Sequence, residues 1–102
     1  MDISILTQKM NDFVQSKGWY EKNSSRPQTL RNLVISLNLE ASEMLEIFQW
    51  EDQPDRKNAL EDELADVALY LFQIANVAEI GLEAAIMKKL DENINRTWRE
   101  TE

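Results

Sequence analysis

The chain has 102 residues, with 19 acidic and 11 basic side chains and a formal net charge of −8. This length suits one domain and hardly two, so we expect a single domain over residues 1–102. The sequence holds no Cys and no His, which excludes disulfides, thiolate or imidazole metal ligands, and Ser-His or Cys-His catalysis. The acidic balance argues against a nucleic-acid polymer as partner. No apolar run approaches the ~20 residues of a membrane span, so we expect a cytoplasmic protein without a membrane partner.

Four segments carry apolar residues at three- and four-residue steps, the period of a helix. The few glycines and prolines argue against an all-β fold. The sequence therefore predicts an all-α, four-helix-bundle-type domain, in which a short turn at 51–54 makes the second and third helices antiparallel. Asp2 and Pro27 suit the starts of the first two helices. The expected segments are Asp2–Gly18, Pro27–Trp50, Asp55–Ala78 and Gly81–Trp98.

The third segment is more apolar than one side of a small bundle requires. A helix that is apolar nearly all round is buried nearly all round, and a domain of this size cannot cover it alone. We therefore expect a homo-oligomer with contacts between helices, the alternative being a few isolated apolar residues on the surface of a monomer. The residues outside the main stripe are Ala68, Leu69, Phe72, Ala75 and Val77.

The net charge arises entirely in the middle of the chain, because residues 40–66 hold ten acids and two bases. Such a run is usually a solvated surface. Two pairs at a spacing of three residues, Glu40 with Glu43 and Glu63 with Asp66, nevertheless lie at the same angular offset from the apolar stripes of their helices. Antiparallel packing of these helices would bring the four carboxylates together.

Carboxylates gathered at the edge of a core repel one another and resist desolvation, so such a cluster needs a cation. With only oxygen donors in the sequence, the expected ion is Mg²⁺, with Mn²⁺ as a substitute. The alternative is four surface acids that form ordinary salt bridges to Arg31, Lys88 or Lys89. A second alternative is an acidic helical interaction module without catalysis, for example an inhibitor that mimics nucleic-acid charge.

At these residues the sequence resembles the MazG-type all-α nucleoside triphosphate pyrophosphohydrolases, and especially their short dCTP-pyrophosphatase branch. The family has an ExxE pattern on one helix and an ExxD pattern on the next, which here read Glu40-Ala-Ser-Glu43 and Glu63-Leu-Ala-Asp66. The ending FQW at 48–50 and the segment KLDENINRTW at 89–98 are also similar to the family. The resemblance extends from about Phe13 to Trp98.

The resemblance implies Mg²⁺-dependent hydrolysis of a nucleoside triphosphate, such as dCTP or dATP, to the monophosphate and pyrophosphate, in a dimer or a dimer of dimers. A homologue that binds the nucleotide without hydrolysing it is the alternative within the family. The resemblance implies that Glu40, Glu43, Glu63 and Asp66 are the metal ligands and catalytic residues. Aromatic faces stack on any nucleobase, and basic side chains bind phosphate. The expected substrate-binding residues are Trp19, Arg31, Trp50, Tyr70, Lys89, Asn93 and Arg96.

Overall fold

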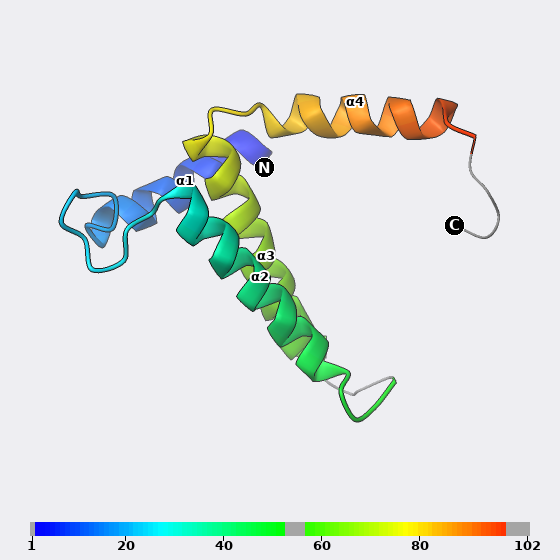
Figure 1. The fold of residues 1–102 in the computed structure, drawn as a ribbon, viewed down its shortest axis with the longest axis horizontal. Helices are drawn as coiled ribbons and strands as arrows, with labels where there is room; N and C mark the ends of the chain where they lie inside the picture. Colours follow the sequence, from blue (N-terminus) through cyan, green and yellow to red (C-terminus); the bar gives the residue numbers. More distant parts are fainter. Residues whose placement is uncertain (1, 53–56, 98–102) are drawn as a thin grey trace.

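The structure is a computed structural model in which residues 2–52 and 57–97 are described. Within these ranges the chain is all-helical, as the sequence predicts, and contains no strand. Figure 1 shows the helices in chain order. They are α1 (Ile3–Ser16), α2 (Leu30–Ile47), α3 (Lys57–Val77) and α4 (Leu82–Asn95).

Helix α1 begins and ends with the capping residues that the sequence predicts. The Asp2 side chain accepts a hydrogen bond from the backbone N–H of Ile5 at 3.0 Å. Gly18, with a φ of +70°, follows the last turn in the left-handed conformation. The Gly18 N–H then donates to the Gln15 carbonyl, and the Trp19 N–H donates to the Val14 carbonyl, which is the Schellman arrangement. This turn sends the chain back toward α1.

The start of α2 differs from the prediction, which placed Pro27 in the first helical position. The helix begins at Leu30, and Thr29 is its N-cap, because the Thr29 hydroxyl accepts the Asn32 N–H at 3.2 Å. Pro27 remains in the preceding loop, where its carbonyl accepts a hydrogen bond from the Asn32 side-chain amide. A hydroxyl that satisfies a free N–H of the first turn determines this start more strongly than the φ preference of proline.

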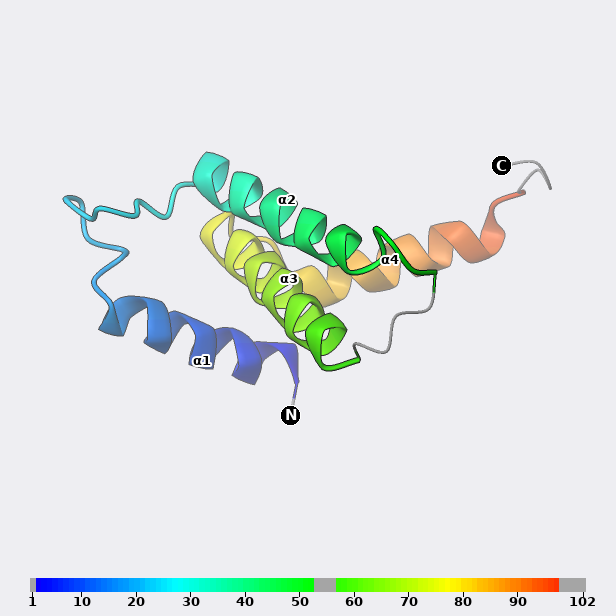
Figure 2. The same cartoon turned by 90° about the horizontal axis from the view of Figure 1, so that it is seen from below.

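Helices α2 and α3 form an antiparallel hairpin, and α1 packs on α3 (Figures 1 and 2). The buried apolar residues of the described chain lie between these three helices, and they are Met10, Val14, Leu33, Ile47 and Ala75. This core is small for the size of the chain. Many large apolar side chains on α2 and α3 stay exposed, including Leu39, Leu45 and Leu64.

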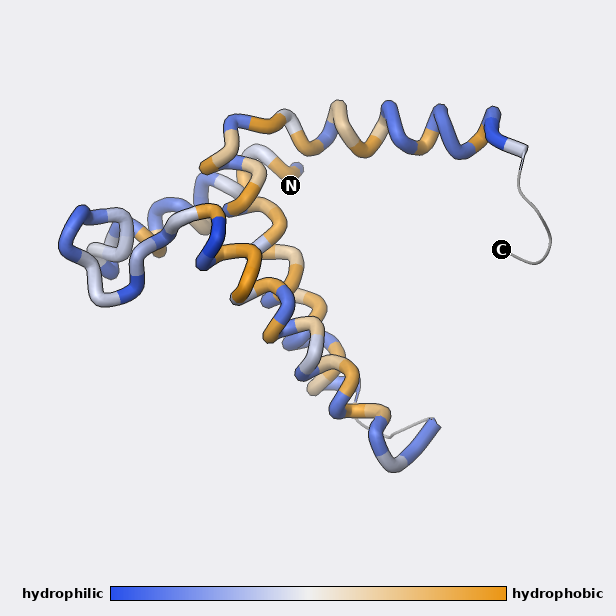
Figure 3. Tube along the Cα trace, in the orientation of Figure 1, coloured by the Kyte–Doolittle hydropathy of each residue, from blue (hydrophilic) through white to orange (hydrophobic). Residues whose placement is uncertain are grey.

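Helix α4 does not join the other three. It turns by 105° from α3 and projects away from the hairpin (Figures 1 and 2), and none of its residues is buried. Apolar and hydrophilic positions alternate along it (Figure 3), and Ile86, Leu90 and Ile94 are exposed on its surface. The sequence predicts that four helices pack together, but within one chain only α1, α2 and α3 do so. The amphipathic pattern of α4 predicts a buried face without specifying what buries it.

Three sequence predictions lie wholly or partly outside the described residues. They are the turn at 51–54, the helix start at Asp55 and the inclusion of Trp98 in the fourth helical segment. No single described helix is long and apolar enough to span a membrane; α3 and α4 satisfy that test only as a bent pair.

The cap at Gly18 gives a first prediction. Replacing Gly18 by Ala places a Cβ in the left-handed region, so we expect a loss of about 1 kcal/mol of unfolding free energy, although the added atom meets nothing within 4 Å. Gly81→Ser is the matched control, because Gly81 is the N-cap of α4 with a φ of −75° and equally open surroundings, and serine suits that position. Urea unfolding at one fixed protein concentration measures both variants. Equal losses in the two would contradict the role given to the Gly18 backbone.

Candidate functional site

Three of the four predicted carboxylates converge between α2 and α3. One carboxylate oxygen from each of Glu40, Glu43 and Glu63 lies within 4.8 Å of the other two. Glu40 and Glu43 are neighbours on α2, one turn apart, and Glu63 reaches them from the antiparallel α3. Glu40 and Glu63 are half-buried, whereas Glu43 is exposed. The hairpin therefore produces the juxtaposition that the two acidic patterns predict.

The cluster is electrostatically unfavourable as it stands. Burial and the neighbouring carboxyls of Glu40 and Glu43 together raise the pKa of Glu63 to about 7, with burial the largest cause. Burial also raises the pKa of Glu40, and the charges of Glu43 and Asp66 act in the same direction. In the described part of the chain, no lysine or arginine forms an ion pair with the three glutamates. The alternative of ordinary surface salt bridges is therefore wrong for this cluster, and Lys89 pairs instead with Glu92 at 3.6 Å.

A hard divalent cation would supply what the cluster lacks. The Oε2 atoms of Glu40 and Glu63 are buried and accept no hydrogen bond from any described residue. Buried acceptors without a partner are costly, and a bound cation satisfies them directly. All the converging ligands are carboxylate oxygens, the type that Mg²⁺ and Mn²⁺ take. The residues present therefore fit such an ion.

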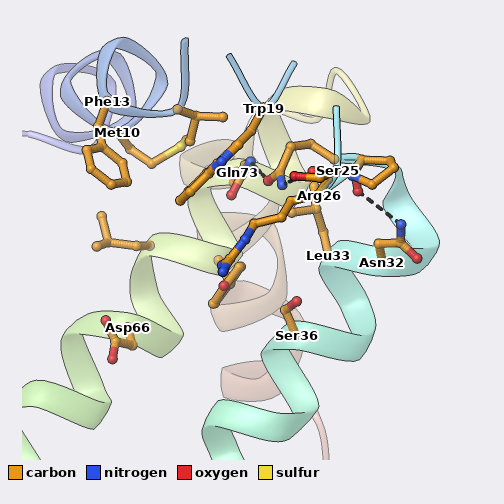
Figure 4. A pocket seen from close by; sticks show the side chains of 15 residues that line it. Met10, Phe13, Trp19, Ser25, Arg26, Asn32, Leu33, Ser36, Asp66 and Gln73 are labelled. Atoms are coloured by element: carbon orange, nitrogen blue, oxygen red, sulfur yellow. Dashed lines mark hydrogen bonds between the residues drawn. The ribbon is translucent and has the colours of Figure 1, made fainter. Parts of the chain in front are cut away.

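Asp66, the fourth predicted carboxylate, lies one turn beyond Glu63 on α3 and outside the group of three. It is still close enough to raise the pKa of Glu40. Asp66 also lines a cavity of about 460 Å³ between α1, the following loop, α2 and α3 (Figure 4). Asp66 thus connects the acid cluster to the cavity, because the positions 63, 66, 70 and 73 follow one face of α3 at helical spacing.

The cavity has an aromatic wall that the Gly18 turn positions. Trp19 follows Gly18 directly, and its ring meets the Phe13 ring edge-on, with the centroids 5.7 Å apart. A contact between these two positions commonly accompanies the Schellman turn. Tyr70 lies on α3 on the same face as Asp66 and also lines the cavity. Two of the predicted substrate-binding residues, Trp19 and Tyr70, therefore line the same cavity as Asp66.

The other predicted substrate-binding residues lie elsewhere in the single chain. Arg31 is exposed on the first turn of α2 and does not line the cavity. Trp50 is 86% exposed beyond the end of α2. The remaining three, Lys89, Asn93 and Arg96, are carried by α4 and its C-cap, which project away from the hairpin (Figure 1).

Two cavity residues did not emerge from the sequence as site residues. Arg26 is the basic side chain of the cavity wall, and Gln73 is buried at its inner end, with 4% of its surface exposed. The signal for Gln73 was present, because it continues the spacing that runs from Glu63 through Asp66 and Tyr70. Arg26 had no such signal, since it lies in an irregular loop.

Comparisons with known proteins agree with this geometry. The model of the MazG-like family matches residues 35–102, which include both acidic motifs. The chain belongs to the MazG-like family. A similar solved structure is that of a pyrophosphatase from Archaeoglobus fulgidus, with 35% identity, a TM-score of 0.75, and coverage of 88% of this chain and 86% of that one.

Curated relatives of this MazG-like chain carry the name dCTP pyrophosphatase 1. The protein from Rattus norvegicus is 31% identical over 94 residues, and the one from Homo sapiens is 30% identical over 94 residues. In each case the match covers 83% of this chain and 52% of the relative. The chain thus spans about half the length of the curated relatives that it matches.

The unpaired glutamates make stability depend on pH in a defined direction. Glu63 has a folded-state pKa of about 7, above its ordinary value of 4.5. Its stabilising contribution is therefore complete below pH 4.5 and is lost as the pH rises through about 7. Without a divalent metal we expect the melting temperature to fall between pH 5 and pH 8. Mg²⁺ at ten times its Kd should add about 1.4 kcal/mol to the free energy of unfolding.

Thermal unfolding by circular dichroism at both pH values, with EDTA or with Mg²⁺, measures this effect at one protein concentration. Glu63→Gln should flatten the pH dependence and reduce the response to Mg²⁺. Glu46→Gln should change neither, because Glu46 is exposed and outside the cluster. A wild-type response to Mg²⁺ that Glu63→Gln retains in full would exclude the cluster as the cation site.

Proposed function

We propose that this protein is a Mg²⁺-dependent nucleoside triphosphate pyrophosphohydrolase, which releases the monophosphate and pyrophosphate. The observation that carries the proposal is the convergence of Glu40, Glu43 and Glu63, with two buried and unpartnered oxygens, beside an aromatic cavity. A metal next to a cavity of this kind suits a ligand with phosphates at one end and a flat ring at the other. The MazG-like family and the names of the relatives support the same reaction.

The roles follow from where the residues lie. Glu40, Glu43 and Glu63 would hold the metal, with Asp66 available at the entrance to the cavity. When bound, the ion neutralises phosphate charge and activates water for attack on phosphorus. Trp19 and Tyr70 would hold the nucleobase, which fixes the phosphates over the carboxylates and excludes water from the ring. Hydrolysis then adds one water across a phosphoanhydride bond.

The proposed substrates are deoxynucleoside triphosphates such as dCTP or dATP, in keeping with house-cleaning of the nucleotide pool. The curated relatives are named for dCTP, which makes this nucleotide the first to test. The rival proposal, an acidic interaction module without catalysis, requires spread surface charge. The convergence of three glutamates on one point argues against it.

Pyrophosphate release from all common dNTPs and NTPs, with Mg²⁺ and with EDTA, tests the reaction. We expect release only with the metal, together with the matching monophosphate. Glu40→Gln should lower kcat at least about a hundredfold, since metal stabilisation of the transition state is worth several kcal/mol. Glu46→Gln is the matched control on the same helix and should leave kcat nearly unchanged. No release from any nucleotide by folded protein, with Mg²⁺ or Mn²⁺, would overturn the proposal.

The position of α4 supports a homodimer or a dimer of dimers with shared sites. Lys89, Asn93 and Arg96 lie on α4 or at its cap, away from the acid cluster of their own chain, while the apolar residues of α4 are exposed. A second copy that covers α4 would bury these apolar residues. It would also receive the basic and amide side chains of α4 beside its own carboxylates, where they would bind phosphate.

Complementation between two inactive variants tests this arrangement. Glu43→Gln and Lys89→Ala, co-expressed in equal amounts, should recover about a quarter of wild-type activity, because half the dimers are mixed and each mixed dimer has one intact site. The control pair, Glu43→Gln with Glu63→Gln, should recover nothing, since both residues belong to the same hairpin. No recovery in the first pair, with mixed dimers demonstrated, would contradict shared sites.

A further inference from the structure

The loop between α1 and α2 extends a single basic side chain into the cavity. Among the described residues that line the cavity, Arg26 is the one cation and Asp66 the one anion. The guanidinium carbon of Arg26 lies 5.4 Å from the centre of the Trp19 ring. Figure 4 shows the Arg26 side chain reaching from the loop into the cavity beside Trp19. A base bound against Trp19 would therefore lie next to this guanidinium.

The loop that carries Arg26 is fixed to the helical hairpin by two glutamines. Buried Gln73 on α3 donates its side-chain N–H to Gln28 Oε1 at 2.6 Å, across 45 positions of the sequence. Gln28 in turn donates its Nε2 to the backbone carbonyl of Arg26 at 2.6 Å. The backbone N–H of Arg26 donates to Ser24 Oγ at 2.9 Å. The peptide groups on both sides of Arg26 are thus held, while its side chain projects into the cavity.

Most of the amide donors at the cavity are already used within the protein. Gln73 donates to Gln28 Oε1, Gln28 donates to the Arg26 carbonyl, and Asn32 donates its Nδ2 to the Pro27 carbonyl at 3.0 Å. Within the described ranges, Arg26 forms no ion pair, and its recorded contact is the face of Trp19. Its planar set of N–H donors is therefore available to a ligand in the cavity.

We propose that Arg26 determines base specificity by donating two hydrogen bonds to the base of the bound nucleotide. This inference rests on the proposed function. A guanidinium fork fits bases that offer two adjacent acceptors, O2 and N3 of cytosine or O6 and N7 of guanine. In adenine N1 and N7 each adjoin the amino donor, and N3 has no neighbouring acceptor, so adenine accepts one bond where these bases accept two. The protein should therefore favour cytosine and guanine nucleotides over adenine nucleotides. Gln73 is a positioning residue that acts through Gln28.

Binding of the monophosphates dCMP, dGMP and dAMP tests this inference without turnover. Isothermal titration in Mg²⁺ should give at least about fivefold tighter binding of dCMP or dGMP than of dAMP, the discrimination expected from one bidentate contact. Arg26→Met should reduce the ratio to about one. Arg26→Lys should not restore it, because an ammonium keeps the charge and loses the fork. Lys22→Met is the matched control, an exposed cation in the same loop that does not line the cavity, and should keep the wild-type ratio.

Gln73→Met keeps the side-chain volume and removes the hydrogen bond, so it separates positioning from stability. We expect it to lower the dCMP-to-dAMP ratio as Arg26→Met does, and the double variant to add nothing further. A lower melting temperature with an unchanged dCMP-to-dAMP ratio would assign Gln73 a structural role only. It would overturn the claim that Gln73 positions Arg26. Equal binding of the three monophosphates by wild type, no binding of any of them, or an unchanged ratio in Arg26→Met would overturn the inference. Pyrophosphate release decides the proposed function separately.

Discussion

Three carboxylates lie within 4.8 Å of one another and form no ion pair within the described residues, and the rest of the structure depends on this constraint. Their repulsion and desolvation oppose folding, and burial and mutual repulsion raise the pKa of Glu63 to about 7. Apolar packing of α2 on α3, with Leu33 only 2% exposed, holds the two helices together against this cost. The same arrangement suits the proposed cation site, because its ligands are already assembled. The repulsion that lowers the stability of the folded chain would then favour binding of the ion.

The helices themselves were largely predictable, for reasons that particular residues make clear. Apolar spacing and caps such as Asp2 and Gly18 are local, so a sequence pattern records them directly. The start of α2 was predicted three residues early, since Pro27 and Thr29 both suit a helix start and only the hydrogen bond to Asn32 decides between them. The place of α4 was not predictable in this way. Its apolar face indicates burial, yet nothing local says whether the same chain or another one supplies the cover.

In the candidate site, too, the residues placed by local patterns were predictable, and those placed by long-range contacts were not. Two acidic pairs at a spacing of three residues, on helices joined by a short connection, predict a shared face, and three of the four carboxylates meet there. Trp19 was predicted from its place in a polar loop and from the family resemblance, and it lines the cavity. Arg26 and Gln73 were not, because their relation depends on a hydrogen bond across 45 positions through an irregular loop. No periodicity connects a loop to a helix, so pattern analysis finds the charged centre more readily than the wall of the cavity.

The carboxylates proposed to bind metal and the residues proposed to contact the base also lie on different parts of the fold. The carboxylates lie on two packed helices, where backbone hydrogen bonds and a shared core fix their positions. Trp19 and Arg26 lie in the loop between α1 and α2, held by the Gly18 turn at one end and by Gln28 and Gln73 at the other. A change in the loop would therefore alter what meets the nucleobase in the proposed site and leave the carboxylates in place. In that proposal, different residues serve metal binding and base choice, and Gln73, on the face of α3 that carries Glu63 and Asp66, connects the two groups.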